Sequence, residues 1–487
     1  MPLATNGRRL VLAALLATAG LAAALRVVQL GHDSLWVDEA FFADIAGSGW
    51  GSLFDRATSA DPNPPLYYAV LHFWIALFGD SEAALRSLSA VGGVLLVLVV
   101  YALGSRRLGG TGVGLCAALL AAISEFFVHY SQEARVYSLL ALLAAASYYF
   151  FLQLLDGATT AAVLGYVLAT TALVYAHTYG LFVVAAQIGF ALVALLWRRG
   201  WIPWADRRAF ALTLAAPLVL AAPWFVVFAG HVRAEVQDSN AAKLSWLGTP
   251  TLHDIPGVLS GYVGSRWGLL VLFAGLLVAA VVAWRGSSSV EGVVRPILHN
   301  RDVVLLFLWL IVPIVAPLVI SLVATPIYQF KYTIPAAVAF YLLVALALNA
   351  FGPWVALAAS VAVGLVLLVP TVSYYDNHTE EWRQAAALVS AKAQPGDTVV
   401  FDSSVSKTAF DYYWARRDVS EVMGSHVSGL TDTDLATVQT AASGTHAIWL
   451  VISHSRDPEG EIPALLGESR REVGDTQLHW VRILRFE

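Results

Sequence analysis

The sequence predicts an α-helical polytopic membrane protein with a C-terminal soluble α/β domain, and three observations lead to this fold class. First, 58% of the 487 residues are hydrophobic and 13% are charged, whereas soluble domains average roughly 45–50% and about 25%. Second, the mean hydropathy is +0.68, and apolar runs long enough to cross a bilayer recur along most of the chain. Third, acidic and hydroxyl residues return together after Pro370, with short β-branched runs between them.

Eleven apolar runs are predicted to be membrane spans. The first, at 10–25, follows Arg8 and Arg9. A basic segment before a short apolar run also fits a signal peptide, but the many later runs favour an uncleaved span with a cytoplasmic N-terminus. The other ten spans lie at roughly 84–105, 110–127, 135–153, 160–176, 180–197, 208–229, 267–284, 303–324, 333–350 and 352–370.

One further apolar run, at 65–78, is assigned by the placement of basic residues. It has about 14 residues, fewer than the roughly 20 that a spanning helix needs. Short cytoplasmic loops collect Lys and Arg, and the clusters to place are Arg106–Arg107, Arg198–Arg199 with Arg207–Arg208, and Arg285, Arg295 and Arg301. If 65–78 crossed the membrane, the first two clusters would lie outside. We therefore expect 65–78 to lie along the outer interface and the C-terminus to be outside.

Two domains follow from this topology. Residues 1–370 form the transmembrane domain, with a first outer loop at 31–83 that carries interfacial helices and a second long outer loop at 230–266. Residues 371–487 form the extracytoplasmic α/β domain, with strands expected at Thr398–Phe401 and Ile448–Ile452 and a helix over 380–389. The net charge of -5 without a basic stripe argues against nucleic-acid binding. The single Cys116 excludes a disulfide framework and a cysteine-based metal site.

The first outer loop carries two adjacent acids, Asp38 and Glu39, just beyond the first span. They could simply complement the dipole at the start of an interfacial helix. Alternatively, one carboxylate removes a proton from an acceptor hydroxyl at the edge of an apolar site. Adjacent helical residues point about 100° apart, so one acid would be the base and the other a positioning group or metal ligand.

Other polar residues are expected at the same depth. Glu133 and Arg135 lie in a turn between two apolar helices, where they form either a structural ion pair or a site in which Arg135 binds an anionic group. Lys331 lies at the outer mouth of the tenth span, where it either extends to the interface or binds an anion. The turn from His177 to Gly180 adds a further polar group.

In order along the chain, the acidic pair Asp38–Glu39 is followed by Pro-Pro-Leu-Tyr-Tyr at 64–68, by Phe-Gly-Asp-Ser-Glu-Ala-Ala-Leu-Arg at 78–86, by Gln-Glu-Ala-Arg-Val-Tyr at 132–137 and by Lys-Tyr-Thr-Ile-Pro at 331–335. Over about residues 10–370 this combination resembles the GT-C superfamily of integral membrane glycosyltransferases, in the branch of protein O-mannosyltransferases and the bacterial aminoarabinose transferase of lipid A. The C-terminal region resembles the soluble domains of bacterial members.

The resemblance implies a GT-C fold and an inverting transfer of a sugar from a polyprenyl-phosphate carrier to an acceptor hydroxyl at the outer face of a bacterial plasma membrane. It makes Asp38 the catalytic base and Glu39 its companion, and it places Arg135, Lys331 and Tyr332 at the donor phosphate. Further substrate-binding candidates are Glu133, His177, Tyr179 and Arg266. The chain departs from the family pattern at Asn63, where related transferases often carry a basic residue, and at Lys331, where an Arg is frequent.

We expect no cofactor, although the carboxylates of Glu39, Glu133 and Asp44 could coordinate a divalent metal. The expected partners are a polyprenyl-phosphate sugar, membrane lipids, and a lipid, glycan or protein acceptor. A lipid flippase or transporter is the rival interpretation, because several helices with a few polar residues also suit a transport pathway. Clustering of the charged residues at one face, and no evident inverted repeat, favour a transferase. Neither the sugar nor the acceptor is identified by the sequence.

Overall fold

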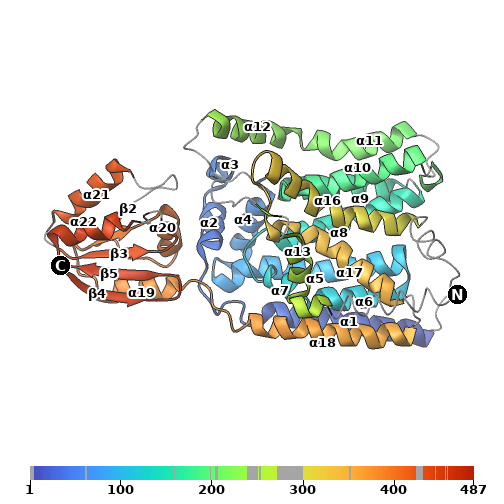
Figure 1. The fold of residues 1–487 in the computed structure, drawn as a ribbon, viewed down its shortest axis with the longest axis horizontal. Coiled ribbons are helices and arrows are strands. Elements are labelled where there is room, and N and C mark those ends of the chain that lie inside the picture. The colour runs from blue at the N-terminus through green and yellow to red at the C-terminus, as the bar shows by residue number, and fades with distance from the viewer. Residues whose placement is uncertain are drawn as a thin grey trace.

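Long helices form a bundle, and a small sheet with its own helices is attached at one end of it (Figure 1). In this computed structural model, the described residues are 5–60, 63–157, 159–197, 199–202, 207–237, 250–251, 254–270, 300–349, 353–423, 431–444, 446–455, 457 and 459–487. We call the end of the bundle that carries α2 (Val37–Gly47), α3 (Trp50–Ala60) and the sheet the sheet end.

The remaining helices of the bundle part are α1 (Thr5–Val27), α4 (Leu66–Phe78), α5 (Glu82–Leu103), α6 (Thr111–Ile123), α7 (Glu125–His129), α8 (Tyr137–Asp156), α9 (Thr160–Ala176), α10 (Gly180–Trp197), α11 (Arg207–Leu220), α12 (Ala222–Gln237), α13 (Asp254–Val263), α16 (Arg301–Val323), α17 (Ile334–Asn349) and α18 (Pro353–Tyr374). Short helical turns of other types are η1 (Gly104–Leu108), η2 (Arg199–Trp201) and η3 (Phe330–Thr333).

Ten of the eleven predicted spans overlap described helices, and most of 267–284 lies outside the described residues. Two of the ten are each divided between two helices, 110–127 into α6 and α7 and 208–229 into α11 and α12. Within the described part of the chain, five helices are long and apolar enough to cross a membrane, and the pair α11 and α12, bent by 50°, makes a sixth candidate. Five more apolar helices have 10–17 residues. The apolar run at 65–78 is the short helix α4, as expected. The count of eleven spans therefore stays a prediction.

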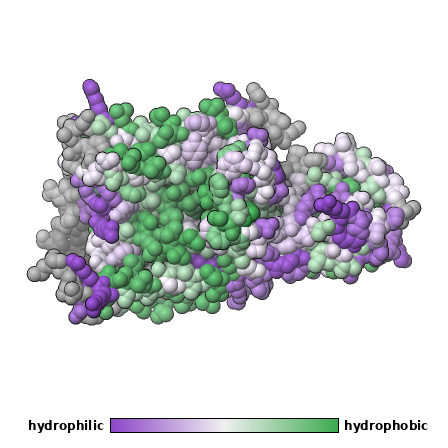
Figure 2. Space-filling model, turned by 180° about the vertical axis from the view of Figure 1, so that it is seen from behind, coloured by the Kyte–Doolittle hydropathy of each residue, from purple (hydrophilic) through white to green (hydrophobic). Residues whose placement is uncertain are grey.

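The surface agrees with a multi-pass membrane protein. A broad hydrophobic band covers the bundle, whereas hydrophilic residues gather at the far end of the bundle and over the sheet part (Figure 2). Large apolar side chains of the bundle helices are exposed, for example Leu168 and Val226. Arg107 and Arg301, which the topology places on the same side of the membrane, both pair with Asp156, at 2.7 and 2.8 Å.

The C-terminal part contains the expected sheet with helices on both faces. Its strands are β1 (Thr398–Phe401), β2 (Ser420–Met423), β3 (Ile448–Ile452), β4 (Glu472–Gln477) and β5 (Arg482–Phe486), in the order β2-β1-β3-β5-β4. Strand β1 pairs parallel with β2 and β3, whereas β5 pairs antiparallel with β3 and β4. The two strands predicted from the sequence are β1 and β3, with the predicted bounds.

Alternation along the strands divides the core of this part into two layers. Val399 and Phe401 face α19 (Trp382–Lys392) and α20 (Ser404–Asp411), and they belong to the same buried cluster as the helical bundle. Val400 faces the other way, toward α21 (Asp432–Ala442) and α22 (Glu461–Ser469). Because α20 packs against α2, the apolar core continues from the bundle into the C-terminal part.

Candidate active site

The two adjacent acids begin helix α2 at the sheet end of the bundle, and they face different surroundings. Glu39 is fully buried. Its carboxylate accepts hydrogen bonds from the backbone N–H of Trp36 at 3.3 Å and of Ala134 at 2.7 Å, and the first of these is half of a capping box. Asp38 is 36% exposed. This divergence follows from the rotation of about 100° per helical residue.

Glu39 is held by a buried ion pair that the sequence analysis did not find. Arg86, in the first turns of α5, donates from Nε to Oε1 at 2.8 Å and from Nη2 to Oε2 at 2.6 Å. Both side chains are almost completely buried. Of the two roles open to the companion of Asp38, this geometry favours a positioning group, because Arg86 and two backbone amides already occupy both of its oxygens.

Arg86 also fixes the loop between α1 and α2. Besides its two bonds to Glu39, it donates from Nη1 to the carbonyl oxygens of Leu30 and Asp33 at 3.1 and 2.9 Å, and from Nη2 to that of Ser34 at 2.8 Å. These five hydrogen bonds match the five N–H groups of a guanidinium. Arg86 on α5 therefore anchors the loop that leads to Asp38 at three backbone carbonyl groups.

Asp38, Arg135 and Lys331 come together although they lie far apart in the sequence. Nη1 of Arg135 is 2.9 Å from Oδ2 of Asp38, and Nζ of Lys331 is 3.8 Å from the same oxygen. Both cations are mostly buried, with 10% and 18% of their side chains exposed. A carboxylate that is accessible to solvent thus lies beside two converging cations, which is an arrangement able to hold an anion next to a base.

Aromatic rings hold the two cations in place. The guanidinium of Arg135 lies 4.3 Å from the ring centroid of Phe42, and it donates to the hydroxyl of Tyr137 at 3.1 Å. Nζ of Lys331 lies 5.4 Å from the ring of Trp36 and 5.6 Å from that of Tyr137. Contacts of this kind favour a charged group over a ring face, so the rings orient both cations without neutralising them.

Three further substrate-binding candidates pack together next to Lys331, namely Tyr332, His177 and Tyr179. The ring of Tyr332 contacts the rings of His177 and Tyr179, with centroids 4.7 and 5.1 Å apart. His177 is buried, and its Nδ1 accepts the backbone N–H of Tyr179 at 3.1 Å. Burial, with the charges of Arg135 and Lys331, lowers the pKa of His177 to about 3, so this histidine is neutral and adds no positive charge to the cluster.

Glu133 pairs with a histidine rather than with Asp38, although the charges of Lys331 and Arg135 also act on it. Oε1 of Glu133 pairs with Nε2 of His129 at 3.1 Å, and Glu125 lies 3.4 Å from the other ring nitrogen of that histidine. Burial acts to lower the pKa of His129, but the two carboxylates outweigh it and raise the pKa to about 10. Arg266 is exposed, and none of the contacts described links it to Asp38, so its role stays a prediction. Of the outer loop expected over the site, 230–266, residues 238–249 and 252–253 lie outside the described residues, and its described part includes the end of α12 and α13.

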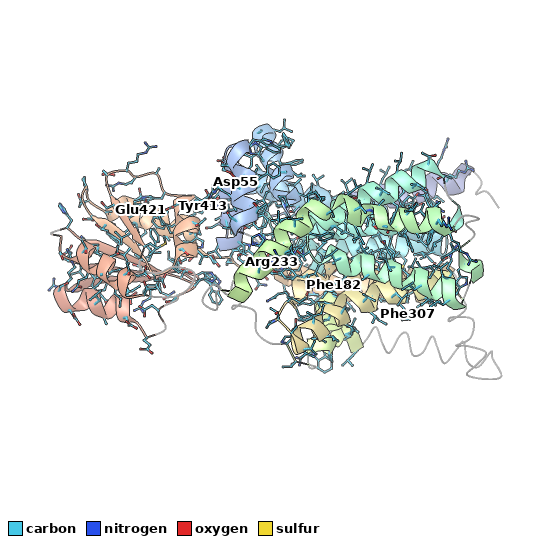
Figure 3. The ribbon with its side chains drawn as sticks, turned by 90° about the horizontal axis from the view of Figure 1, so that it is seen from above. Asp55, Phe182, Arg233, Phe307, Tyr413 and Glu421 are labelled. Atoms are coloured by element: carbon cyan, nitrogen blue, oxygen red, sulfur yellow. The ribbon has the colours of Figure 1, made fainter. Side chains whose placement is uncertain are left out.

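The C-terminal part also holds the loop that carries Asp38. The backbone N–H of Leu35 donates to the hydroxyl of Tyr413 at 2.8 Å, and that of Val37 donates to Oε2 of Glu380 at 3.0 Å. Oε1 of Glu380 accepts from Nε2 of His454 at 2.7 Å. Figure 3 shows Tyr413 at the side of the C-terminal part that faces the bundle. No sequence signal marked Tyr413 and Glu380, because they lie more than 340 positions from Leu35 and Val37.

A cavity of about 170 Å³ lies between this loop and the connection from α18 to the C-terminal part. One carboxylate oxygen of Glu133, Oε2, is buried there and receives no hydrogen bond from the described residues. The lining residues are Gln29, Leu30, Asp33, Trp36, Glu39, Arg86, His129, Gln132, Glu133, Tyr374, Tyr375, Asn377, His378 and Thr379. Trp36, which lines this cavity, also lies beside the two cations, with its ring centroid 5.8 Å from the guanidinium of Arg135 and 5.4 Å from Nζ of Lys331.

Comparison with known proteins agrees with the resemblance found in the sequence. Residues 62–226 match the sequence model of the dolichyl-phosphate-mannose-protein mannosyltransferase family. A comparison with curated protein sequences gave no match.

Solved structures share the fold over nearly the whole chain. ArnT from Cupriavidus metallidurans in the apo state superposes with a TM-score of 0.65 at 16% identity, over 97% of this chain and 97% of that one. The same protein bound to undecaprenyl phosphate gives 0.61 at 16% identity, over 99% and 98%. The apo oligosaccharyltransferase from Archaeoglobus fulgidus gives 0.56 at 13% identity, over 95% and 73%. This chain therefore shares its fold with ArnT and with the archaeal oligosaccharyltransferase.

Proposed function

We propose that this chain, which has the GT-C glycosyltransferase fold, is an inverting glycosyltransferase that moves a sugar from a polyprenyl-phosphate carrier to an acceptor hydroxyl at the outer face of a bacterial plasma membrane. The observation that carries the proposal is the convergence of Arg135 and Lys331 on Asp38, at 2.9 and 3.8 Å. The likeness in fold to an ArnT that binds undecaprenyl phosphate supports a lipid phosphate as the anion.

In the proposed reaction Asp38 is the base. It takes the proton of the acceptor hydroxyl while the hydroxyl oxygen attacks the anomeric carbon. The bond between that carbon and the phosphate oxygen breaks on the opposite face, and the electron pair leaves with the polyprenyl phosphate. One displacement inverts the anomeric centre, and no covalent enzyme intermediate forms.

Arg135 and Lys331 stabilise the leaving phosphate, which gains negative charge as the bond breaks. Cations already in place next to the developing charge need no reorganisation, and removal of one such group typically costs about 10²–10³ in kcat. His177, Tyr179 and Tyr332 line the donor side behind Lys331. Glu39 and Arg86 hold the start of α2 and thereby keep Asp38 in position.

In this proposal the chemistry and the support of the catalytic loop belong to different domains. Residues 1–370 carry the proposed chemistry, and residues 371–487 form an extracytoplasmic domain whose Glu380 and Tyr413 hold the catalytic loop. In this proposal side chains alone perform the transfer.

The test uses purified full-length protein, a panel of polyprenyl-phosphate sugars and membrane lipids as acceptors, with free polyprenyl phosphate followed by mass spectrometry. We expect release from one donor, and loss of that release in Asp38→Asn at unchanged folding. Turnover retained by Asp38→Asn would remove Asp38 from the mechanism. No release from any donor would favour a flippase, which the same lipids in proteoliposomes would reveal as movement between leaflets.

A further inference from the structure

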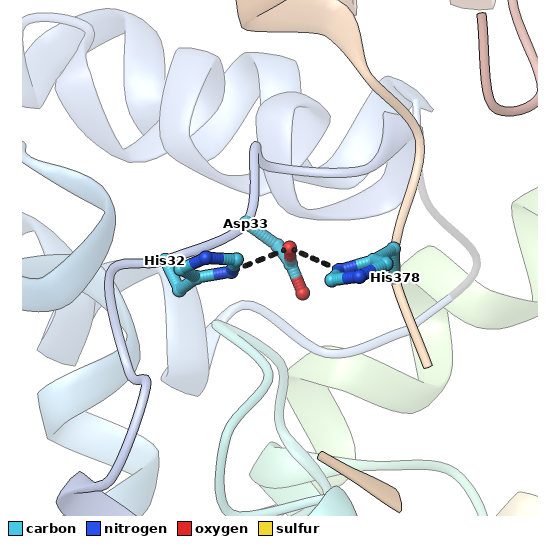
Figure 4. Close-up of side chains that lie close together, drawn as sticks. All are labelled: His32, Asp33 and His378. Atoms are coloured by element: carbon cyan, nitrogen blue, oxygen red, sulfur yellow. Dashed lines mark hydrogen bonds and ion pairs between the residues drawn. The ribbon is translucent and has the colours of Figure 1, made fainter. Parts of the chain in front are cut away.

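A cluster of two histidines and one aspartate lies where the loop before α2 meets the connection that leaves α18. Nδ1 of His32 lies 3.1 Å from Oδ1 of Asp33, and Nδ1 of His378 lies 3.2 Å from the same oxygen. Figure 4 shows the two imidazoles on either side of this carboxylate, each turned toward it. His378 is 345 residues from Asp33 in the sequence, so the fold creates the cluster.

The spacing of these three atoms fits a tetrahedral metal site. Zinc binds His nitrogen and Asp oxygen at about 2.0–2.1 Å, so two ligands at a tetrahedral angle lie about 3.3 Å apart. Both separations from Oδ1 of Asp33 are close to this value, and all three ligand atoms lie within 4.8 Å of one another. Closure of the two imidazoles from within 4.8 Å of each other to about 3.3 Å completes the triangle.

The backbone around the ligands is already fixed, which reduces the ordering that metal binding would require. Arg86 donates to the carbonyl of Asp33 at 2.9 Å. Next to His378, the hydroxyl of Thr379 donates to the carbonyl of Ser34 at 2.9 Å. The side chains themselves remain open to solvent, with 57% of His32 and 56% of His378 exposed, so an ion can enter and a water can take the fourth position.

We propose that His32, Asp33 and His378 bind one divalent transition-metal ion, with zinc preferred. Two imidazoles with one carboxylate suit zinc rather than magnesium or calcium, which prefer oxygen ligands. The bound ion links the loop that carries Asp38 to the connection into the C-terminal part, and it thereby stabilises their contact. The ion is structural and takes no part in the transfer, and the proposal does not rest on the proposed reaction.

Metal content of the full-length protein tests the site. Tag-free protein in detergent is stripped with EDTA, incubated with zinc sulfate, desalted and analysed for zinc per chain. We expect one equivalent in the wild type and at least a tenfold weaker affinity in His32→Ala, His378→Ala and Asp33→Asn. The control is His479→Ala, because His479 is an exposed histidine of the C-terminal part, and it should retain the full equivalent.

Two further measurements separate a specific site from loose binding. Cobalt in place of zinc should give the visible bands of a tetrahedral complex in the wild type and in His479→Ala, but not in His378→Ala. Zinc should also slow proteolysis at residues 375–381 in the same two proteins alone. Circular dichroism confirms that each variant is folded. Less than one-fifth of an equivalent in the wild type, or full retention in folded His378→Ala, would overturn the proposal.

Discussion

Arg86→Lys tests whether the loop that carries Asp38 depends on one guanidinium. The substitution keeps the positive charge opposite Glu39 but replaces five N–H donors by three. Arg86 uses all five, two toward Glu39 and three toward the carbonyl oxygens of residues 30, 33 and 34. At least two acceptors therefore lose their donor in the variant.

The cost follows from burial. A buried polar group left without a partner costs about 1–3 kcal/mol, so two such groups predict a loss of about 2–6 kcal/mol. Arg86 lines the cavity beside the loop, and water entering it can satisfy part of the deficit, which favours the lower end of this range. A misplacement of catalytic groups by about 1 Å can cost 10²-fold in rate, so kcat should fall at least tenfold.

Thermal unfolding in detergent, followed by intrinsic fluorescence, measures the first effect, and release of polyprenyl phosphate measures the second. The matched control is Arg56→Lys, because Arg56 forms an exposed ion pair with Asp44 and such pairs contribute about 0–1 kcal/mol. If Arg86→Lys unfolds at the same temperature as Arg56→Lys and has the same kcat, the loop does not depend on the fork of donors and this reasoning fails.

Three other predictions concern charge. Arg135→Ala and Lys331→Ala should each raise the Kd for the lipid-phosphate donor about tenfold or more, measured by lipid titration; unchanged affinity in both would move the phosphate site elsewhere. The hydrogen bond to Glu380 raises the pKa of His454, so its contribution to stability is complete below about pH 6.5 and is lost as pH rises through the raised value; His454→Gln should remove that part of the pH dependence of the Tm. The pKa of His129 is raised to about 10, so its contribution to stability is lost between about pH 6.5 and 10. Parallel profiles of Tm against pH for the wild type and His129→Gln would contradict this prediction.

Local patterns predicted the elements well because the relevant physics is local. Apolar length predicted the helices, and the β-branched runs at 398–401 and 448–452 predicted β1 and β3 with their bounds. Basic side chains such as Arg135 and Lys331 are rare beside apolar segments on the outer side, so these two residues could be singled out. The adjacency of Asp38 and Glu39 likewise implied that only one of them would face a substrate.

Partners across long separations could not be predicted. The sequence showed Arg86 as a basic residue near the start of an apolar helix, but no local pattern identified Glu39 as its partner. Glu380, Tyr413 and His454 look like ordinary residues of a small α/β domain. Tyr413 and Glu380 bind the backbone of Leu35 and Val37, and His454 binds Glu380. These contacts depend on the docking of the C-terminal part, in which α20 packs against α2.

Under the proposed reaction, the summed formal charge of the three groups that meet at Asp38 predicts different effects of Asp38→Asn on donor binding and on turnover. Asp38, Arg135 and Lys331 sum to +1, which matches the single negative charge of a sugar phosphodiester. After transfer Asp38 carries the acceptor's proton, so the sum is +2, which matches the roughly two negative charges of the released phosphate monoester. Asp38→Asn sets the sum to +2 from the start, and it should bind the donor at least as tightly as the wild type while losing about 10²–10⁴-fold in turnover. Donor affinity at least tenfold weaker in a folded Asp38→Asn would mean that Asp38 orients the two cations more than it competes with the phosphate for them.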